Sequence, residues 1–174
     1  ETLLQRTLYG ESHTSPEVQN LRGKPTRHYD GAGALKSESY DFKGNPLVTQ
    51  RNLAVAFTAA TDWTPLATAT TPSAIDAAAA SLLESETFTQ SRQYDALNRV
   101  TSQTEPDLTE IKPTYNQRGL LEKVEARIRN AASWTPFVSS IEYDAKAQRQ
   151  SIEYGNGTAT TYQYDELTYR LKLL

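Results

Sequence analysis

One local pattern occurs four times between Tyr94 and Leu171 and constrains the fold more than any other feature. In each copy a tyrosine is followed by Asp or Asn, and in the first two copies Asn or Gly stands four positions after the tyrosine. Successive tyrosines are 21, 28 and 21 residues apart. A period of this size indicates stacked supersecondary units. The four tyrosines are Tyr94, Tyr115, Tyr143 and Tyr164.

Each copy predicts a turn followed by a β-hairpin. The Asp or Asn side chain can accept a hydrogen bond from the backbone N–H two residues on, which starts a turn. Gly or Asn at the end of the motif tolerates a positive φ, which closes the turn. A second turn is expected at 106–108 in the first unit and at 155–157 in the third. Asn156-Gly157 predicts a two-residue type I′ turn, which requires positive φ at both central residues.

The unit that begins at Tyr115 is expected to be the same hairpin with a longer tip near 130–136. Its rising arm alternates apolar residues, such as Val124 and Ala126, with charged residues, which indicates a half-buried strand. The apolar residues at 120, 121, 124 and 128 would also suit one face of a helix, so periodicity alone leaves both open. The hairpins on either side favour the strand.

Weaker copies of the pattern stand nearer the N-terminus. Gly23 and Gly44 are 21 residues apart and occupy matching positions in two similar segments. Tyr29 and Tyr40, each followed by Asp, are 11 residues apart, which is about half a unit. One strand and one turn therefore take 10 or 11 residues, and residues 1–8 could form a further short strand.

The pattern is interrupted at residues 53–87, which contain neither Tyr nor Gly. Thr71 or Ser73 could cap a helix that has Pro72 in its first turn. A short helix is therefore expected at 73–84, with an apolar face that lies against the sheet or bridges two layers. That face consists of Ile75, Ala79, Leu82 and Leu83. The chain is expected to divide into repeat strands at 1–52, the insert at 53–87 and regular hairpins at 88–174.

Composition narrows the class of protein. The 18 basic and 21 acidic residues give a net charge of −3, and the basic residues are scattered, so nucleic acid is not an expected partner. The absence of cysteine excludes disulfides and thiolate metal ligands. No apolar run approaches the roughly 18 residues that a membrane helix needs. The chain begins at Glu1 rather than Met and stops as a strand begins, which suggests a piece of a larger protein.

Reactive residues form no pattern that predicts an enzyme or a metal site. His13 and His28 lack convergent ligands, and no nucleophile-elbow motif supports a Ser-His-Asp arrangement. The acidic residues at 105, 107 and 110 fit a solvated turn better than a paired-carboxylate glycosidase site. The stretch 31–33 lacks the following helix that a phosphate-binding loop requires. No catalytic, cofactor-binding or metal-binding residue is therefore expected.

The repeated motif resembles the Rhs, or YD-repeat, family, in which Tyr-Asp is followed by two residues and then Gly or Asn. The resemblance covers most of residues 20–174, except the insert. Segments such as Tyr40–Asn45 and Tyr94–Arg99 are most similar to the repeat region of the B and C components of bacterial insecticidal toxin complexes. The six copies begin at Tyr29, Tyr40, Tyr94, Tyr115, Tyr143 and Tyr164.

This resemblance implies a mainly β fold, in which antiparallel hairpins form part of a spiralling sheet that encloses a toxic C-terminal domain. It implies a secreted or bacterial cell-surface protein whose partners are other parts of the shell, the enclosed domain and other toxin-complex components. The self-cleaving shells of the family end in an Asp-Pro-x-Gly core, and this chain has no Asp-Pro pair. It therefore resembles an internal piece of wall, which could self-associate through strand edges.

The residues expected to matter are structural rather than catalytic, since tyrosine buries a ring and keeps a hydroxyl for a partner. The set comprises Tyr29, Asp30, Gly33, Tyr40, Asp41, Gly44, Tyr94, Asp95, Asn98, Tyr115, Asn116, Gly119, Tyr143, Asp144, Tyr164 and Asp165. Two other classes remain open. An extracellular carbohydrate- or receptor-binding module would present an exposed aromatic patch, and a hydrolase would form a cleft around Glu105 and Asp107.

Overall fold

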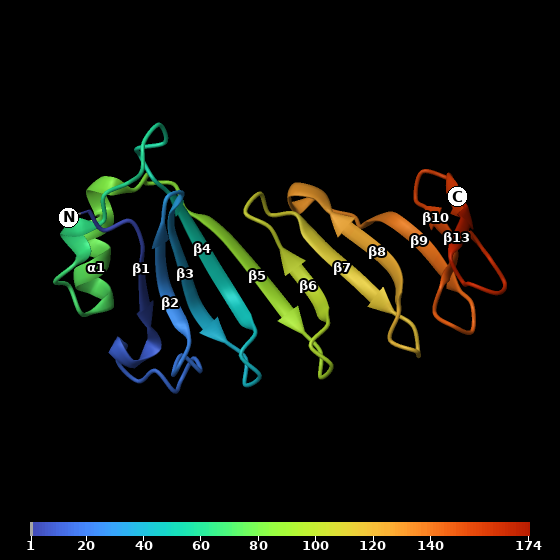
Figure 1. The fold of residues 1–174 in the computed structure, drawn as a ribbon, viewed down its shortest axis with the longest axis horizontal. Helices are drawn as coiled ribbons and strands as arrows, with labels where there is room; N and C mark the ends of the chain where they lie inside the picture. Colours follow the sequence, from blue (N-terminus) through green and yellow to red (C-terminus); the bar gives the residue numbers. More distant parts are fainter. Residues whose placement is uncertain (1) are drawn as a thin grey trace. The chain divides into compact units, whose positions relative to one another are not determined.

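The computed structural model describes residues 2–174 and divides into two compact units, the first ending at Arg92 and the second beginning at Gln93. Neighbouring strands of the first unit are antiparallel, and their order in the sheet follows their order in the chain (Figure 1). The strands are β1 (Arg6–Tyr9), β2 (Pro25–Asp30), β3 (Gly33–Tyr40), β4 (Pro46–Leu53) and β5 (Phe88–Tyr94), and a 3₁₀ turn at Gly10–Ser12 follows β1.

The insert between β4 and β5 contains the expected helix, α1 (Pro72–Ala79). Thr71, one of the two caps that the sequence allows, accepts a hydrogen bond from the backbone N–H of Ala74 at 3.3 Å, and Ser73 lies inside the helix. The helix ends earlier than the expected 73–84, and a 3₁₀ turn, η3 (Ala80–Leu82), follows it. Leu83 is extended because it pairs with Ala54 at the end of β4, which returns the chain to the sheet.

The core of the first unit lies between the sheet and the insert. Tyr29 and Trp63 are fully buried, with ring centroids 5.2 Å apart and ring planes at 56°. A tilted pair of this kind adds a favourable ring contact to the burial of apolar area. Ile75 and Ala79 of α1 are buried against it, while Leu82 and Leu83 pack at its edge, so all four residues of the expected apolar face contact the core. The buried cluster consists of Tyr29, Ala34, Trp63, Leu66, Ile75 and Ala79.

The second unit consists of antiparallel hairpins. One set of strands, β6 to β11, is again ordered as in the chain, and β12 pairs with β13. The strands are β6 (Val100–Thr104), β7 (Glu110–Tyr115), β8 (Leu121–Arg127), β9 (Thr135–Tyr143), β10 (Arg149–Tyr154), β11 (Ala159–Thr161), β12 (Gln163–Tyr164) and β13 (Leu171–Leu173). The fold is therefore mainly antiparallel β with one short helix, as predicted.

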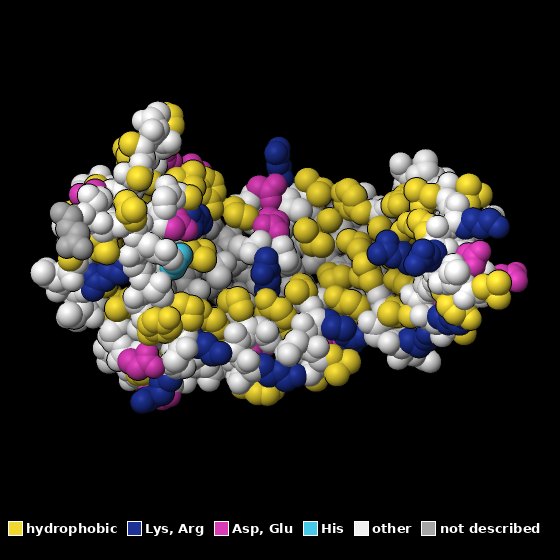
Figure 2. All heavy atoms as spheres, viewed as in Figure 1, with side chains coloured by type: hydrophobic (Ala, Val, Ile, Leu, Met, Phe, Trp, Pro, Cys, Tyr) yellow, Lys and Arg dark blue, Asp and Glu magenta, His cyan; other side chains and the backbone are white. Residues whose placement is uncertain are grey.

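The rising arm after Tyr115 is a strand, so the helical alternative is wrong. In β8 the apolar Val124 and Ala126 share one face, and Ala126 is buried because Ile111 of β7 lies opposite it. Hydrophobic side chains gather over β7 to β9 on the face shown in Figure 2. The longer tip of this unit occupies residues 128–134, close to the predicted place. Within the described residues, no helix combines the length and the apolar character needed to cross a bilayer.

Candidate functional site: the repeated tyrosine–aspartate turn

The turn after Tyr94 shows how the motif folds. The backbone N–H of Asp95 donates to the carbonyl of Arg99 at 2.9 Å, and the N–H of Asn98 donates to the carbonyl of Asp95 at 3.1 Å. The Oδ1 atom of Asp95 accepts from the N–H groups of Leu97 at 2.8 Å and Arg99 at 3.0 Å. Asn98 has a φ of 63°, so the turn closes with a left-handed residue. This is a three-residue hairpin loop of the type I plus bulge kind.

The same turn recurs after Tyr40, Tyr115 and Tyr143. In each, the oxygen of the Asp or Asn side chain accepts from the N–H groups two and four residues on, at 2.8 to 3.1 Å. Gly44 and Gly119 occupy the left-handed position, as predicted. In the third turn this position belongs to Ala147, with a φ of 66°, although a Cβ disfavours that conformation. The turn after Tyr164 is one residue longer and has Tyr169 at its left-handed position.

The copy at Tyr29-Asp30 is different. Asp30 pairs directly with Gly33 across a two-residue loop, and its Oδ1 accepts only the first of the two bonds, from Ala32 N–H at 2.9 Å. Gly33 is the first residue of β3, with a φ of 127°, and a Cβ there would lie 2.1 Å from the carbonyl oxygen of Asn52. Close approach to β4 therefore explains this glycine.

Two further turns share the backbone pattern without a Tyr-Asp pair. At the tip after β6, Glu105 N–H donates to the carbonyl of Thr109, and Leu108 is left-handed. At the tip after β10, Tyr154 N–H donates to the carbonyl of Thr158, and only Gly157 is left-handed. The predicted type I′ turn at Asn156-Gly157 is therefore wrong. The Asn side chain accepts from the N–H of Thr158 at 3.0 Å, which stabilises the three-residue loop instead.

Three repeat tyrosines tie neighbouring strands together through their hydroxyl groups. Each stands at the end of a strand and donates to the carbonyl of the first residue of a neighbouring strand. The bonds run from Tyr40 to Pro25 at 2.5 Å, from Tyr115 to Val100 at 3.1 Å and from Tyr143 to Leu121 at 2.7 Å. Tyr40 is buried, and Tyr94, Tyr115, Tyr143 and Tyr164 are half-buried. The tyrosine rings therefore lie partly packed while their hydroxyls hold adjacent strands in register.

Side chains also connect one turn to the next in the second unit. The guanidinium of Arg118 donates to the carbonyls of Asp144 at 2.7 Å and Ala145 at 3.0 Å. Gln148 of that turn donates in the same way to the carbonyl of Tyr169 at 2.8 Å. Each contact adds a side-chain donor to a carbonyl of the neighbouring turn, so successive turns support one another.

Hydrogen bonds within the turns lower the pKa values of Asp41, Asp95 and Asp165. The N–H of Arg99, followed by its guanidinium, holds the pKa of the Asp95 carboxyl below its usual range. The side-chain amide of Asn45 does the same for the pKa of Asp41, and the N–H of Thr168 for that of Asp165. Hydrogen bonds to the ionised form favour it, so these turns contain carboxylates at neutral pH.

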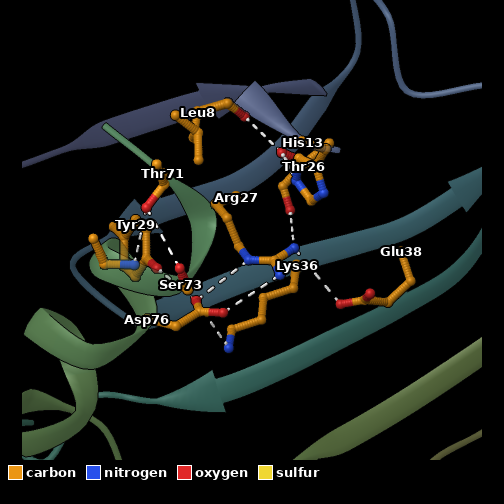
Figure 3. Close-up of polar contacts among 11 residues, drawn as sticks. Leu8, His13, Thr26, Arg27, Tyr29, Lys36, Glu38, Thr71, Ser73 and Asp76 are labelled. Carbon is orange, nitrogen blue, oxygen red and sulfur yellow. Dashed lines mark hydrogen bonds and ion pairs between the residues drawn. The ribbon is translucent and has the colours of Figure 1, made fainter. Parts of the chain in front are cut away.

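Tyr29 belongs to a polar cluster that the sequence did not predict. Its hydroxyl donates to Asp76 Oδ1 at 3.2 Å, and Asp76 also binds Arg27 Nε at 3.3 Å and Lys36 Nζ at 3.1 Å. Figure 3 shows Asp76 reaching from α1 toward these groups on β2 and β3. Burial acts to raise the pKa of Asp76, but the charges of Arg27 and Lys36 outweigh it and hold the pKa low.

The cluster therefore attaches the insert to the sheet. Arg27 is 7% exposed, so its charge needs the carboxylate of Asp76 as a buried partner. Burial, followed by the negative charge of Asp76, raises the pKa of Tyr29, which keeps its hydroxyl a donor. The one sequence signal was an acidic residue next to Ile75 on an otherwise apolar helix.

The candidate reactive residues are used in structural contacts. Glu110 forms an ion pair with Arg127, and Asp107 accepts from the N–H of Thr109 at 2.9 Å within its turn. His28 lies 2.9 Å from the hydroxyl of Thr7, and His13 lies 3.0 Å from that of Thr26. Among residues 2–174, no group of three or more metal-ligating side chains converges.

The fold and its turns define a class of protein, an antiparallel sheet assembled from repeated Tyr-Asp turns. No family model matches the chain. Toxin subunit YenC1 of Yersinia entomophaga is 27% identical over 98% of this chain, and toxin subunit YenC2 of the same organism is 29% identical over 97%. The chain spans only 16% and 17% of the length of these relatives.

The comparison with solved structures agrees with the comparison of sequences. The crystal structures of TcdB2-TccC3 and of TcdB2-TccC3-Cdc42 match with a TM-score of 0.85 at 24% identity, over 98% of this chain and 8% of theirs. The chain thus shares the fold of a segment of these toxin-complex proteins. The resemblance to the YD-repeat region of B and C components, drawn from the repeated motif, is confirmed.

Proposed function

We propose that this chain is a non-catalytic wall segment of a YD-repeat β-shell that encloses a toxin or effector domain in a secreted bacterial toxin complex. The observation that carries the proposal is the repeated hairpin itself. Each strand pairs with the next along the chain, and the same turn recurs, so a sheet of this kind grows by adding units. A sheet built in this way separates two spaces without needing a large aliphatic core.

The partners that follow are the adjoining parts of the same shell, the enclosed domain and the other components of the complex. The likeness to toxin subunits and to TcdB2-TccC3 supports this assignment. The short span of the chain relative to those proteins supports a part of a wall rather than a whole shell. Secretion or display at the cell surface follows from the same proposal.

Protease access to the enclosed domain tests the proposal. In the parent protein, Tyr143→Phe with Asp144→Ala would remove a strand-to-strand bond and a turn acceptor at one hairpin. We expect the variant to fold and its enclosed domain to be digested several-fold faster than in the wild type. Equal digestion rates, with the hairpin shown by hydrogen exchange to be loosened, would contradict a role in enclosure. Glu142→Gln, an exposed change on the same strand, is the matched control.

The alternative of a binding module that uses the repeat aromatics receives less support. Tyr29 and Tyr40 are buried, and three of the six repeat tyrosines use their hydroxyls on backbone carbonyls. A stacking platform needs open ring faces, whereas two of these rings are buried and the guanidinium of Arg99 lies over a third, that of Tyr115.

A further inference from the structure

A concave site lies at one end of the hairpins in the second unit, where β9 begins and the β10–β11 turn crosses it. The depression has a volume of about 580 Å³. It is lined by Thr135, Pro136, Phe137, Tyr154, Gly155, Asn156 and Thr158. We propose that this depression binds a neutral pyranose sugar, a role separate from the wall function.

The site is built by close contact between the turn and the start of β9. Gly155 N–H donates to the carbonyl of Phe137 at 3.2 Å. A Cβ at Gly155 would lie 1.7 Å from the carbonyl oxygen of Pro136, so no other residue fits there without moving the turn. The turn therefore packs closely against the start of β9, and this contact holds the lining residues of the two segments together.

Its apolar wall suits the C–H face of a sugar ring. Phe137 is 48% exposed, and Tyr154 is half-buried with its ring lining the same depression. Pro136 is exposed beside them. Aromatic rings offer flat apolar area with little loss of side-chain freedom, which is what stacking on a pyranose requires.

Its polar wall presents hydrogen-bond donors. Asn156 Oδ1 accepts from Thr158 N–H at 3.0 Å and from Thr158 Oγ1 at 2.7 Å, which turns the amide Nδ2 away from Thr158. The Tyr154 hydroxyl accepts from Thr160 Oγ1 at 3.5 Å, so its own proton can be donated elsewhere. An amide and a phenol among the lining residues can donate to the oxygens of a polyhydroxylated ring.

The charge of the lining selects a neutral ligand. All seven lining residues are uncharged at neutral pH, so nothing in the lining pairs with a phosphate, a carboxylate or a metal cation. The volume falls within the roughly 300–1,000 Å³ of small-molecule sites. A proline-rich peptide also stacks on aromatic grooves, but two side-chain donors in the lining fit sugar hydroxyls better.

Ligand-observed saturation-transfer NMR tests the inference on the chain itself, with glucose, galactose, mannose and N-acetylglucosamine as separate millimolar probes. We expect saturation of the ring protons of at least one sugar. Phe137→Ala should abolish the signal, and Asn156→Asp, which keeps the turn acceptor but loses the amide donors, should weaken binding about tenfold. Phe42→Ala, which removes an exposed ring from a turn in the first unit, should leave the signal unchanged.

Three outcomes would overturn the inference. The first is no saturation transfer to any of the four sugars. The second is an equal loss of signal in Phe42→Ala and Phe137→Ala, which would indicate non-specific contact. The third is binding of a polyproline peptide, used as a fifth probe, that none of the sugars displaces. Circular dichroism of each variant confirms that the sheet is retained, so a loss of signal reports on the site.

Discussion

At the scale of single residues, one side-chain oxygen organises each turn. Asp95 shows the arrangement: its Oδ1 accepts from the N–H groups two and four residues on, and its backbone closes the same loop. Asn116 does this without a charge, so the geometry of the oxygen matters more than its ionisation. The left-handed residue three positions later is the other local requirement, and Gly, Asn and even Ala fill it.

Ala147→Gly should stabilise the protein. Its left-handed φ of 66° costs an alanine roughly 1–2 kcal/mol, partly offset by the freedom that glycine gains in the unfolded chain. We expect a net gain of about 0.5 kcal/mol in the free energy of unfolding, measured with urea. Gly119→Ala is the converse change and should lose about 1 kcal/mol. A decrease in stability for Ala147→Gly would show that the methyl group makes a contact worth more than the strain.

Stability should fall in acid because Asp41, Asp95 and Asp165 have lowered pKa values in their turns. A group whose pKa is depressed on folding contributes stability above its unfolded pKa and loses it as the pH falls through the folded pKa. The urea concentration at the midpoint of unfolding should therefore decrease as the pH is lowered below about 4. In Asp95→Asn, which keeps the turn acceptor, this drop should be smaller. An unchanged pH profile would mean that the carboxylate of Asp95 is equally stabilised in the unfolded chain.

At the scale of elements, strands and helix are joined by different means. Strands are linked by backbone ladders and by tyrosine hydroxyls that reach the first carbonyl of a neighbouring strand, as from Tyr143 to Leu121. The helix α1 is joined to the sheet by its apolar face and by one carboxylate, Asp76, which contacts two cations and a phenol. Asp76 is therefore the charged residue that links α1 to the sheet, beside backbone bonds such as that from Val55 N–H to the carbonyl of Leu82 elsewhere in the insert.

Asp76→Ala should loosen the insert selectively. It would remove the nearer carboxylate partner of the buried Arg27 guanidinium and leave only the more distant Glu38, which we expect to cost about 2 kcal/mol, reduced from a fully buried pair because Asp76 is partly exposed. Hydrogen exchange should rise at Pro72–Leu82 and remain unchanged in β7 to β10. Glu38→Ala removes a more exposed partner, 3.6 Å from Arg27, and should cost about 0.5 kcal/mol or less. Equal costs for the two variants would contradict the special role of Asp76.

At the scale of the whole molecule, two compact units use one repeated hairpin, and among the described residues the buried core cluster lies in the first unit, where the insert covers the sheet. The hairpins of the second unit bury few residues completely: Ala126, Ile141 and Ile152 are its buried hydrophobic residues among those described. Such a thin sheet gains most of its stability from ladder hydrogen bonds and cross-strand pairs. Its apolar face would gain more if neighbouring polypeptide covered it.

Self-association follows from that architecture. In the sheet of the first unit, β1 pairs only with β2 among the described strands. One side of the β1 backbone can therefore accept a further strand. Light scattering after gel filtration should give a mass above the 19.4 kDa of one chain, and the mass should rise with concentration. Thr7→Lys, which places a charge on this edge strand, should lower the measured mass. A concentration-independent mass of one chain would show that the edges are protected and would weaken the wall proposal.

The sequence by itself determined the elements that depend on neighbours within about five residues. It predicted the turns at Tyr40, Tyr94, Tyr115 and Tyr143 and the strand at β8, and it narrowed the cap of α1 to Thr71 or Ser73, because turn and cap hydrogen bonds join residues two to four positions apart. Within this range the sequence still predicted the wrong turn type at Asn156. A two-residue type I′ turn and a three-residue bulged loop both accept an Asn-Gly pair, and the structure contains the three-residue loop.

The tertiary structure alone decided which distant residues meet. Asp76 and Arg27 are 49 positions apart, and Tyr143 reaches a carbonyl 22 positions away. Such contacts depend on how strands pair and where the insert folds back, and no local pattern encodes a partner at that distance. The same is true of the depression beside Phe137, which exists only because Gly155 lets the turn rest on β9.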